Sequence, residues 1–356
     1  MVTYAAVKQV LEVTLKQQEA HYGLVSSALY TRAWLHPQPT DRVCLFFHGF
    51  TAGPYQMEPI GQHFHRAGYN VVAPLLPGHG RAGQWTKDNP PPLPTDPEVY
   101  QKFGLQWLNL AALLGQHVVV GGLSGGGTLA GWLALERSAQ VHRAILCAPY
   151  LSASSKVIDL FVKKVDTYFA WATATPASDP TPPTALGYPG FSTPALRAVL
   201  ELGQFCQQRV KQAPVAPTFT ISSESDKAVS NFDHQHFFEA ALKHQPISWH
   251  TLFNRVLDIP HTMMTQQEGN RYQHLLNVMI QAFVESNLTW AEVEEIAYRM
   301  TKNRTFNAVV EELGWQAKVS KDMPAMMTMV DKWAITVKRD LNAGRPGNRP
   351  RRPRDR

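Results

Sequence analysis

A serine lies between glycines in the segment Gly122-Leu-Ser124-Gly-Gly126, which has the G-x-S-x-G spacing of a nucleophile held on a sharp turn. The apolar run before it predicts a strand and residues 125–136 predict a helix, which is the context that such a turn requires. Side chains two residues before and after the serine would clash, because strand and helix backbones approach closely there. We take Ser124 as the candidate nucleophile. The alternative is a glycine-rich packing turn with an incidental serine.

A serine hydroxyl is a weak nucleophile until a nearby base accepts its proton and a third group orients that base. His261, in the segment Asp258-Ile-Pro-His261-Thr, follows the last predicted strand and is the candidate base. The chain holds 14 histidines, so the others need an account. His48 and His79 lie in loops whose glycine neighbours suggest backbone contacts. A predicted surface helix carries three more: His234, His236 and His244.

Asp226 follows the predicted strand TFTIS by a few residues, which places its carboxylate at the sheet edge where the serine turn opens. The chain order Ser124, Asp226, His261 is the order used by hydrolases with this turn. A carboxylate bonded to the imidazole would hold its tautomer and stabilise the imidazolium. Glu224 and Asp258 are competing acids. Asp258 lies before His261 on the same loop, so Asp226 is preferred.

The oxyanion that develops in acyl transfer needs preorganised N–H donors. His48-Gly49-Phe50 ends a predicted strand, so the backbone N–H of Phe50 can face the serine turn, and the N–H of Gly125 supplies a second donor. Loss of one such donor typically raises the barrier by about 2.7–4 kcal/mol.

These residues support two-step acyl transfer, which requires no metal or organic cofactor. Ser124 would attack an ester carbonyl, His261 would pass the proton to the leaving alcohol, and water would release the acid. A metal site at Asp233, His234 and His236 is disfavoured, because residues two apart point to different sides of a helix.

Short β-branched runs alternate with segments of helical period from about residue 42, which predicts a mostly parallel, doubly wound α/β sheet. Asp96-Pro97-Glu98 predicts the start of one helix, whose buried face would carry Val99, Phe103, Leu110 and Leu114. The predicted strands are residues 42–47, 69–76, 118–122, 143–149, 218–222 and 247–253, and the other core helices are residues 54–67, 125–136 and about 267–285.

The core, residues 28–149 and 218–286, is interrupted by a segment rich in proline and alanine. This segment, residues 150–217, is too long for a plain loop and predicts a partly helical insertion, which would form a cap or lid over the strand ends. Tyr188 and Phe191 are its candidate substrate-binding residues. At the other end of the core, residues 1–27 predict a short amphipathic helix.

Residues 287–344 predict a helical appendage. Thr289 to Glu292 fits a capping box, and a further helix is expected from about Thr305 to Leu313. We expect these helices to pack on the core and on each other; self-association of two chains through them is the alternative. The last helix would present an apolar stripe of Met326, Val330, Trp333, Val337 and Leu341.

The net charge of +6 does not predict a nucleic-acid-binding protein. Residues 345–356 hold six arginines and one aspartate, a net +5, so the remaining chain is close to neutral. A nucleic-acid surface needs basic residues spread over a folded face. The Arg/Pro tail is instead predicted to be disordered.

Several features favour a cytoplasmic protein without stable membrane insertion. The N-terminal segment carries Lys8, Glu12 and Lys16 inside its apolar spacing, unlike a signal peptide. Two of the three cysteines, Cys44 and Cys147, lie in predicted strands and are expected to be buried thiols. Residues 118–135 are uncharged over 18 positions, but their six glycines favour a strand, a turn and a buried helix over a membrane span.

The segments HGFTAGP (48–54), PLLPGHG (74–80), GLSGGG (122–127) and ESDKAV (224–229), with the late His261, together resemble the carboxylesterase and monoacylglycerol-lipase branch of the α/β-hydrolases. The resemblance covers roughly residues 40–285. It implies an α/β-hydrolase fold with the triad, the oxyanion donors and the acyl-pocket cap at the positions given above. Gly125 stands where that branch usually has a larger residue such as Met, and the helices after residue 287 have no recognised counterpart.

The expected activity is therefore that of a serine carboxylic-ester hydrolase, with a small-molecule ester, of short or medium acyl chain, or a monoacylglycerol as substrate. Thioesters and lactones use the same machinery and remain alternatives. A non-catalytic binding or scaffold protein on the same fold is the alternative of a different class, because fold does not fix function.

Overall fold

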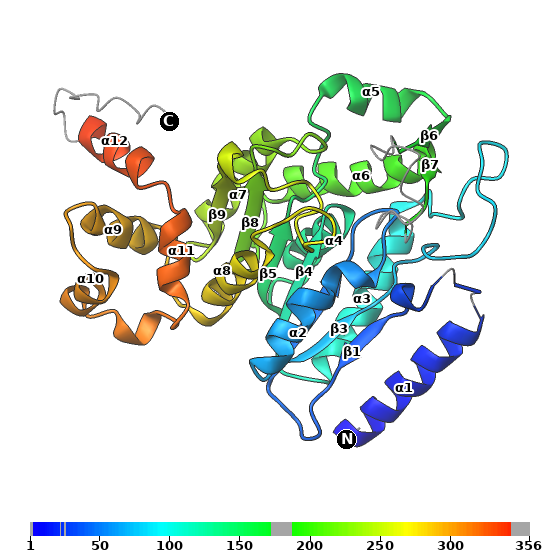
Figure 1. Cartoon of the computed structure of the whole chain (residues 1–356), viewed down its shortest axis with the longest axis horizontal. Coiled ribbons are helices and arrows are strands. Elements are labelled where there is room, and N and C mark those ends of the chain that lie inside the picture. Colours follow the sequence, from blue (N-terminus) through cyan, green and yellow to red (C-terminus); the bar gives the residue numbers. More distant parts are fainter. Residues whose placement is uncertain (1–2, 22, 25, 172–186, 343–356) are drawn as a thin grey trace.

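The computed structural model describes residues 3–21, 23–24, 26–171 and 187–342 of the 356-residue chain. A seven-stranded sheet forms its centre, in the order β1-β3-β2-β4-β5-β8-β9 (Figure 1). β1 pairs antiparallel with β3, and all other neighbours in this sheet are parallel, which confirms the predicted sheet. The strands are β1 (Arg32–Trp34), β2 (Arg42–Phe47), β3 (Asn70–Ala73), β4 (His117–Leu123), β5 (Val141–Cys147), β8 (Thr218–Ser223) and β9 (Trp249–Phe253).

Helices cover both faces of the sheet. The chain runs from β2 to β3 in one direction and from β3 to β4 in the other, so right-handed crossovers place the intervening helices on opposite faces. α2 contacts α8 on one face, and α3 packs on α4 on the other. These helices are α2 (Glu58–Arg66), α3 (Pro97–Ala112), α4 (Gly125–Glu136), α7 (Asn231–His244) and α8 (Gln273–Glu285).

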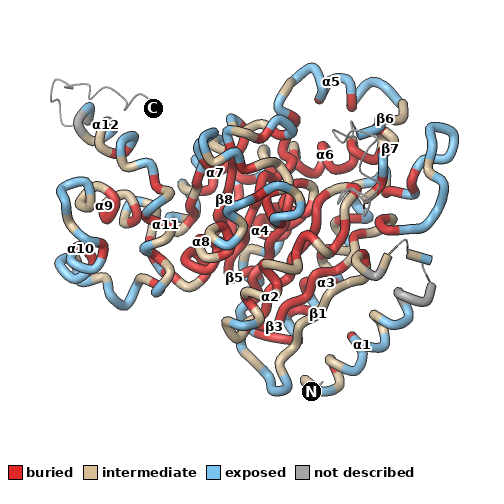
Figure 2. Tube along the Cα trace, in the orientation of Figure 1, coloured by how far each residue is buried: buried red, intermediate tan, exposed pale blue. Residues whose placement is uncertain are grey.

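β4 and α4 lie in the buried centre of the molecule (Figure 2). All residues of β4 after His117 are buried, and residues 126–135 of α4 are buried without interruption. The predicted strand, turn and buried helix at residues 118–135 are therefore present. Because both elements are buried, this stretch carries no charge. Within the described ranges, no helix is long and apolar enough to cross a membrane.

Helix α3 begins where the sequence predicts, because the Asp96 carboxylate accepts the N–H of Glu98 at 2.8 Å. Its predicted buried face is wrong in part. Val99 is 39% exposed, whereas Tyr100 is 4% exposed. A Cβ at Gly104 would lie 3.0 Å from Leu129 Cδ1 of α4, so the close approach of the two helices at this glycine sets the rotation of α3.

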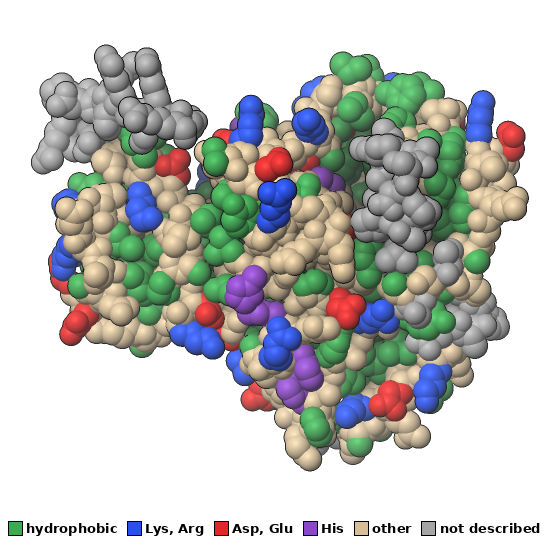
Figure 3. Space-filling view, in the orientation of Figure 1, with side chains coloured by type: hydrophobic (Ala, Val, Ile, Leu, Met, Phe, Trp, Pro, Cys, Tyr) green, Lys and Arg blue, Asp and Glu red, His purple; other side chains and the backbone are tan. Residues whose placement is uncertain are grey.

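The segment between β5 and β8 is partly helical, as predicted. α5 (Lys156–Lys164) is followed by two short antiparallel strands, β6 (Tyr168–Ala170) and β7 (Gly190–Ser192), and by α6 (Thr193–Arg209). α6 packs on α4 and on α5. Hydrophobic side chains of α5 reach the surface at the upper edge of the molecule (Figure 3), among them Val157 and Leu160.

Both ends of the chain carry helices outside the sheet. α1 (Tyr4–His21) confirms the predicted N-terminal helix and buries Val7 and Leu11. α9 (Trp290–Met300) begins at the predicted capping box of Thr289 and Glu292. α10 (Phe306–Leu313) and α12 (Lys332–Asn342) pack on α9, and α11 (Met323–Met329) packs on α8, so the appendage packs on the core and on itself as expected.

The prediction of a single last helix is wrong, because α11 and α12 are two separate helices. Val330 has extended backbone (φ −71°, ψ 128°), and the Asp331 carboxylate accepts the N–H of Ala334 at 2.9 Å to begin α12. The predicted apolar stripe is broken at this point, and Leu341 is 67% exposed. The predicted disordered tail, residues 345–356, lies outside the described residues.

Two glycines of α4 provide a matched test of backbone approach. A Cβ at Gly126 would lie 2.3 Å from the carbonyl oxygen of Phe47, whereas a Cβ at Gly131 would meet only Leu146 methyl groups at 3.6 Å. We expect Gly126→Ala to lower the free energy of unfolding by about 2–3 kcal/mol. Gly131→Ala should raise it by about 0.5–1 kcal/mol. Urea unfolding followed by circular dichroism checks both, and equal effects of the two substitutions would contradict the close approach.

Candidate active site

Ser124 lies between β4 and α4 in a conformation that few non-glycine residues adopt. Its φ is 54° and its ψ is −118°. The flanking glycines allow the turn, because a Cβ at Gly122 would lie 2.5 Å from the carbonyl carbon of Gly126. The Ser124 N–H donates to the Cys147 carbonyl at 2.9 Å, and the Thr128 hydroxyl donates to the Ser124 carbonyl at 3.1 Å. The strained strand–turn–helix geometry expected of a nucleophilic serine is therefore present.

His261 and Asp226 form a hydrogen-bonded pair. The Nδ1 of His261 lies 2.7 Å from Oδ2 of Asp226, whose side chain is fully buried. Burial by itself raises the pKa of Asp226, but hydrogen bonds from His261 and from the N–H groups of Ala228 and Val229 outweigh it and hold that pKa below its usual value. An ionised carboxylate accepts from Nδ1–H, which leaves Nε2 of His261 as the nitrogen that can receive a proton.

The loops that carry this pair are tied to each other and to the loop after β5. Val229 forms an isolated β-bridge with Ala153, and the Ser223 hydroxyl donates to the Ile259 carbonyl at 2.7 Å. Because β4, β5, β8 and β9 run parallel, their carboxyl ends meet at one edge of the sheet. Among the described residues, the Ser124 hydroxyl makes no hydrogen bond to His261.

The competing acids occupy other positions. The Glu224 carboxylate accepts the N–H of Arg255 at 3.0 Å. Asp258 is exposed, with a left-handed backbone at φ 47°. Asp226 is the carboxylate that the structure places on His261.

The two predicted oxyanion donors lie on neighbouring segments. A Cβ built at Gly125 would lie 3.7 Å from the backbone nitrogen of Phe50. The same Cβ would lie 3.3 Å from a methyl carbon of Val199, so α6 fills the space beside Gly125. This packing gives a physical reason for a glycine at the position where the carboxylesterase and monoacylglycerol-lipase branch, which the sequence resembles, usually has a larger residue.

His48 and His79 have the backbone roles that the sequence suggested. Nε2 of His48 accepts the N–H of Leu76 at 2.9 Å, and Nε2 of His79 accepts the N–H of Thr51 at 3.1 Å. Burial lowers the pKa of His48 well below its usual value, and burial lowers the pKa of His79 to about 4. Both rings are therefore neutral at pH 7 and hold the loop around Phe50.

The prediction that His234 lies on a surface is wrong. His236 and His244 are exposed on α7, but His234 is fully buried because its face of the helix packs on β8. Its Nε2–H donates to the Pro149 carbonyl at 2.7 Å, so its Nδ1 accepts the Ser222 hydroxyl at 2.9 Å. Burial lowers the pKa of His234 to about 4. With both nitrogens engaged, this ring braces the loop after β5.

Tyr188 and Phe191, the candidate substrate-binding residues, are both buried. The Tyr188 hydroxyl accepts the N–H of Arg81 at 2.9 Å and donates to the Gly78 carbonyl at 2.7 Å. Phe191 packs on Phe50, with ring centroids 5.2 Å apart. Tyr188 thus anchors a loop, whereas Phe191 lies beside an oxyanion donor, and substrate contact by either stays a prediction.

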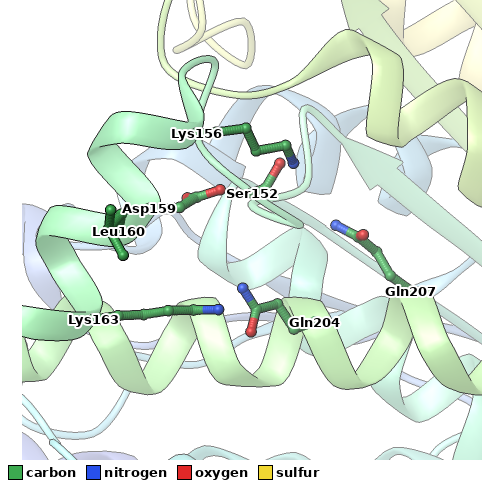
Figure 4. Close-up of a pocket in the computed structure, with 7 residues that line it drawn as sticks. All are labelled: Ser152, Lys156, Asp159, Leu160, Lys163, Gln204 and Gln207. Carbon is green, nitrogen blue, oxygen red and sulfur yellow. The ribbon is translucent and has the colours of Figure 1, made fainter.

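A separate polar pocket of about 310 Å³ lies between α5 and α6 (Figure 4). Lys156 on its wall pairs with Asp233 at 2.9 Å, and Asp233 also accepts the Ser152 hydroxyl. Ser124, Asp226 and His261 do not line this pocket. Its lining residues are Ser152, Lys156, Asp159, Leu160, Lys163, Gln204 and Gln207.

Comparison with known proteins places the chain in a family. A model of the alpha/beta hydrolase family matches residues 44–292, and the chain belongs to that family. Over 90 residues the chain is 37% identical to a thermostable monoacylglycerol lipase from Bacillus sp. (strain H-257). This match covers 25% of the chain and 34% of the lipase, so the chain spans about a third of that relative.

Solved structures share the fold. A structure from a study of LipS and LipT, two metagenome-derived lipolytic enzymes, has a TM-score of 0.54 at 20% identity and covers 73% of this chain and 98% of its own. A monoacylglycerol lipase from Paleococcus ferrophilus has a TM-score of 0.54 at 16% identity and covers 71% of this chain and 96% of its own. The predicted α/β-hydrolase fold is confirmed.

The depressed pKa of Asp226 predicts a pH-dependent contribution to stability. A carboxylate whose folded pKa lies below its unfolded value of about 3.9 stabilises the fold above that value, and the contribution is lost as the pH falls through the folded pKa. Asp226→Asn should therefore lower the free energy of unfolding more at pH 5 than at pH 2. Urea unfolding at the two pH values measures the difference.

Asp258→Asn is the matched control, because Asp258 is exposed and asparagine tolerates its left-handed backbone. It should change stability little at either pH. If Asp226→Asn behaved in the same way, the buried carboxylate would not carry the charge that we assign to it.

Proposed function

We propose that the protein is a serine carboxylic-ester hydrolase that acts through Ser124, His261 and Asp226 by way of an acyl-enzyme. The observation that supports this most is the 2.7 Å contact between His261 Nδ1 and the buried Asp226 carboxylate, at the sheet edge where Ser124 occupies a strained turn. A histidine held in this tautomer is oriented to accept a serine proton through Nε2.

In the proposed mechanism, Ser124 attacks the ester carbonyl carbon while His261 Nε2 takes the hydroxyl proton. The N–H groups of Phe50 and Gly125 donate to the oxyanion, and the Asp226 carboxylate stabilises the imidazolium. His261 then protonates the leaving alcohol, and the acyl group stays on Ser124. Water attacks the acyl-enzyme with His261 as base and releases the acid.

The proposed substrates are esters of short or medium acyl chains or monoacylglycerols. Aromatic side chains cluster beside the oxyanion donor, since Phe191 contacts Phe50, Phe169 and Trp171 with centroid distances of 4.9–5.5 Å. Phe169 and Trp171 are nearly half exposed and offer apolar surface to an acyl chain. The name of the partial Bacillus match, a monoacylglycerol lipase, agrees with this class.

The segment between β5 and β8, residues 150–217, is the proposed cap over this acyl site. Val199 of its helix α6 packs beside Gly125, which follows the nucleophile.

The proposed compartment is the cytoplasm. Cys44, Cys147 and Cys206 are buried free thiols, and disulfides are rare in that compartment. Burial also raises the pKa of the Cys147 thiol to about 12.

Replacement of the nucleophile tests the mechanism directly. Ser124→Ala should lower turnover of p-nitrophenyl butyrate at least about 1000-fold, because no other group forms the acyl-enzyme. It should also abolish covalent labelling by a fluorophosphonate. Ser138→Ala is the control, since Ser138 precedes β5 at the opposite edge of the sheet. Undiminished turnover in Ser124→Ala would rule out this nucleophile, and absence of turnover in the wild type would favour a binding protein.

A substrate series tests the acyl class. With p-nitrophenyl esters from acetate to palmitate, kcat/KM should peak at short or medium chains and then fall as longer chains extend past the apolar surface of Phe169 and Trp171. Racemic 1-monoacylglycerols of the same acids, an acyl-coenzyme A thioester and a γ-lactone complete the series. A kcat/KM for the thioester or the lactone at least tenfold above the best ester would overturn the assignment to carboxylic esters.

A further inference from the structure

Glu268 lies on the loop that follows His261, and its carboxylate is hydrogen-bonded to the segment that follows β2. Its Oε1 accepts the Gln56 amide at 2.8 Å and the Tyr55 hydroxyl at 3.2 Å, and its Oε2 accepts the Thr265 hydroxyl at 3.0 Å. Burial raises the pKa of Glu268, although these hydrogen bonds and the nearby His261 act in the other direction. Glu268 is partly buried, so these partners replace water that its carboxylate has lost, and two of the three belong to the segment after β2.

Gln56 continues the connection toward the loop that carries Gly49 and the proposed oxyanion donor Phe50. It is 2% exposed, and its Oε1 accepts the N–H of Gly49 at 2.9 Å. Since a backbone N–H can only donate, the side-chain oxygen of Gln56 must face Gly49 and its nitrogen must face Glu268. Both ends of the Gln56 amide are therefore fixed, and one rotamer is selected.

Gly49 needs such support because a glycine restrains its own backbone least. Its carbonyl is held by Nδ1–H of His48 at 2.9 Å and by the N–H of Ala52 at 3.2 Å. That carbonyl and the N–H of Phe50 share one peptide plane, so fixing the oxygen fixes the direction of the N–H. Gln56 holds the other end of Gly49, and the two restraints together set its φ and ψ.

We propose that Glu268 and Gln56 are positioning residues of the oxyanion hole, which tie the loop of the base His261 to the loop of the donor Phe50. Neither touches the reacting atoms. Glu268 sets the Gln56 rotamer, Gln56 sets the Gly49 backbone, and Gly49 aims the Phe50 N–H. The inference rests on the proposed function, because it assigns a task to the oxyanion donor of that mechanism.

The expected effect falls on the transition state. A misdirected donor loses part of the contribution of a whole donor, which is about 100- to 1000-fold in kcat, so loss of the tie should cost about 10- to 100-fold in kcat. KM should change less than about threefold, because the ground-state carbonyl carries little charge for the donor to stabilise.

Gln56→Leu tests this against a matched control, Gln281→Leu. Gln281 of α8 is 5% exposed and donates its amide to Glu285 at 3.1 Å, so both substitutions remove a buried amide that is bonded to a glutamate. We expect Gln56→Leu to lower kcat at least tenfold for p-nitrophenyl butyrate, and Gln281→Leu to change it less than twofold at a similar loss of Tm. Equal values of kcat in the two variants at matched Tm would overturn the proposal.

Variants of Glu268 separate positioning from charge. In Glu268→Gln a side-chain oxygen can still accept from Gln56, so kcat should stay within about threefold of the wild type. In Glu268→Leu the partner is lost, and kcat should fall as in Gln56→Leu. The kcat of the double variant Gln56→Leu/Glu268→Leu should be no lower than that of the less active single variant, because both substitutions break the same connection. A loss in Glu268→Gln as large as in Glu268→Leu would refute the tie.

The same assay distinguishes this failure from failure of the proposed function. If Ser124→Ala abolishes turnover while Gln56→Leu matches Gln281→Leu, the triad stands and the positioning role is wrong. If Ser124→Ala retains turnover, the catalytic assignment itself is wrong, whatever the glutamine variants do.

Discussion

The close approach of β2, β4 and α4 at the serine turn is the constraint on which the rest of the site depends. A Cβ at Gly126 would meet the carbonyl oxygens of both Phe47 and His48, at 2.3 and 2.4 Å. No side chain separates the end of β2 from the start of α4, so the segment after β2 reaches the turn at Ser124. The glycines that permit the turn at Ser124 therefore also bring the backbone nitrogen of Phe50 close to Gly125.

Backbone strain gathers at the same edge of the sheet. In the described part of the chain, five non-glycine residues have positive φ, and four of them follow the carboxyl ends of strands: Thr51, Ser124, Ala148 and Asp258. Such conformations cost about 1–3 kcal/mol each and persist only where the surroundings fix them. Hydrogen bonds around Ser124 show how this happens, since the Thr128 hydroxyl bridges the carbonyls of Ser124 and Tyr150. Hydrogen bonds of this kind hold the strained edge in place.

The sequence predicted the elements whose signals are local. The strand at residues 42–47 and the helix at residues 125–136 agree with the structure at both ends, because apolar continuity and glycine spacing mark them. The rotation of α3 could not be predicted, since it depends on the contact between Gly104 and Leu129. The burial of His234 was missed for the same reason, because it depends on packing between α7 and β8. The break between α11 and α12 had a local signal in Asp331, a helix-capping residue type, but the apolar stripe obscured it.

The candidate site shows the same division between local signals and distant contacts. Ser124, Asp226 and His261 each follow a strand, so chain order made them candidates, whereas Gln56 and Glu268 are polar residues 212 positions apart in the sequence. Their contact arises only because the loops after β2 and β9 meet over the parallel edge. The strands fix where each loop begins but not how its peptide planes point. Directional bonds between loops must supply that second level of order, and in this molecule they run from the loop after His261 to the loop that carries Phe50.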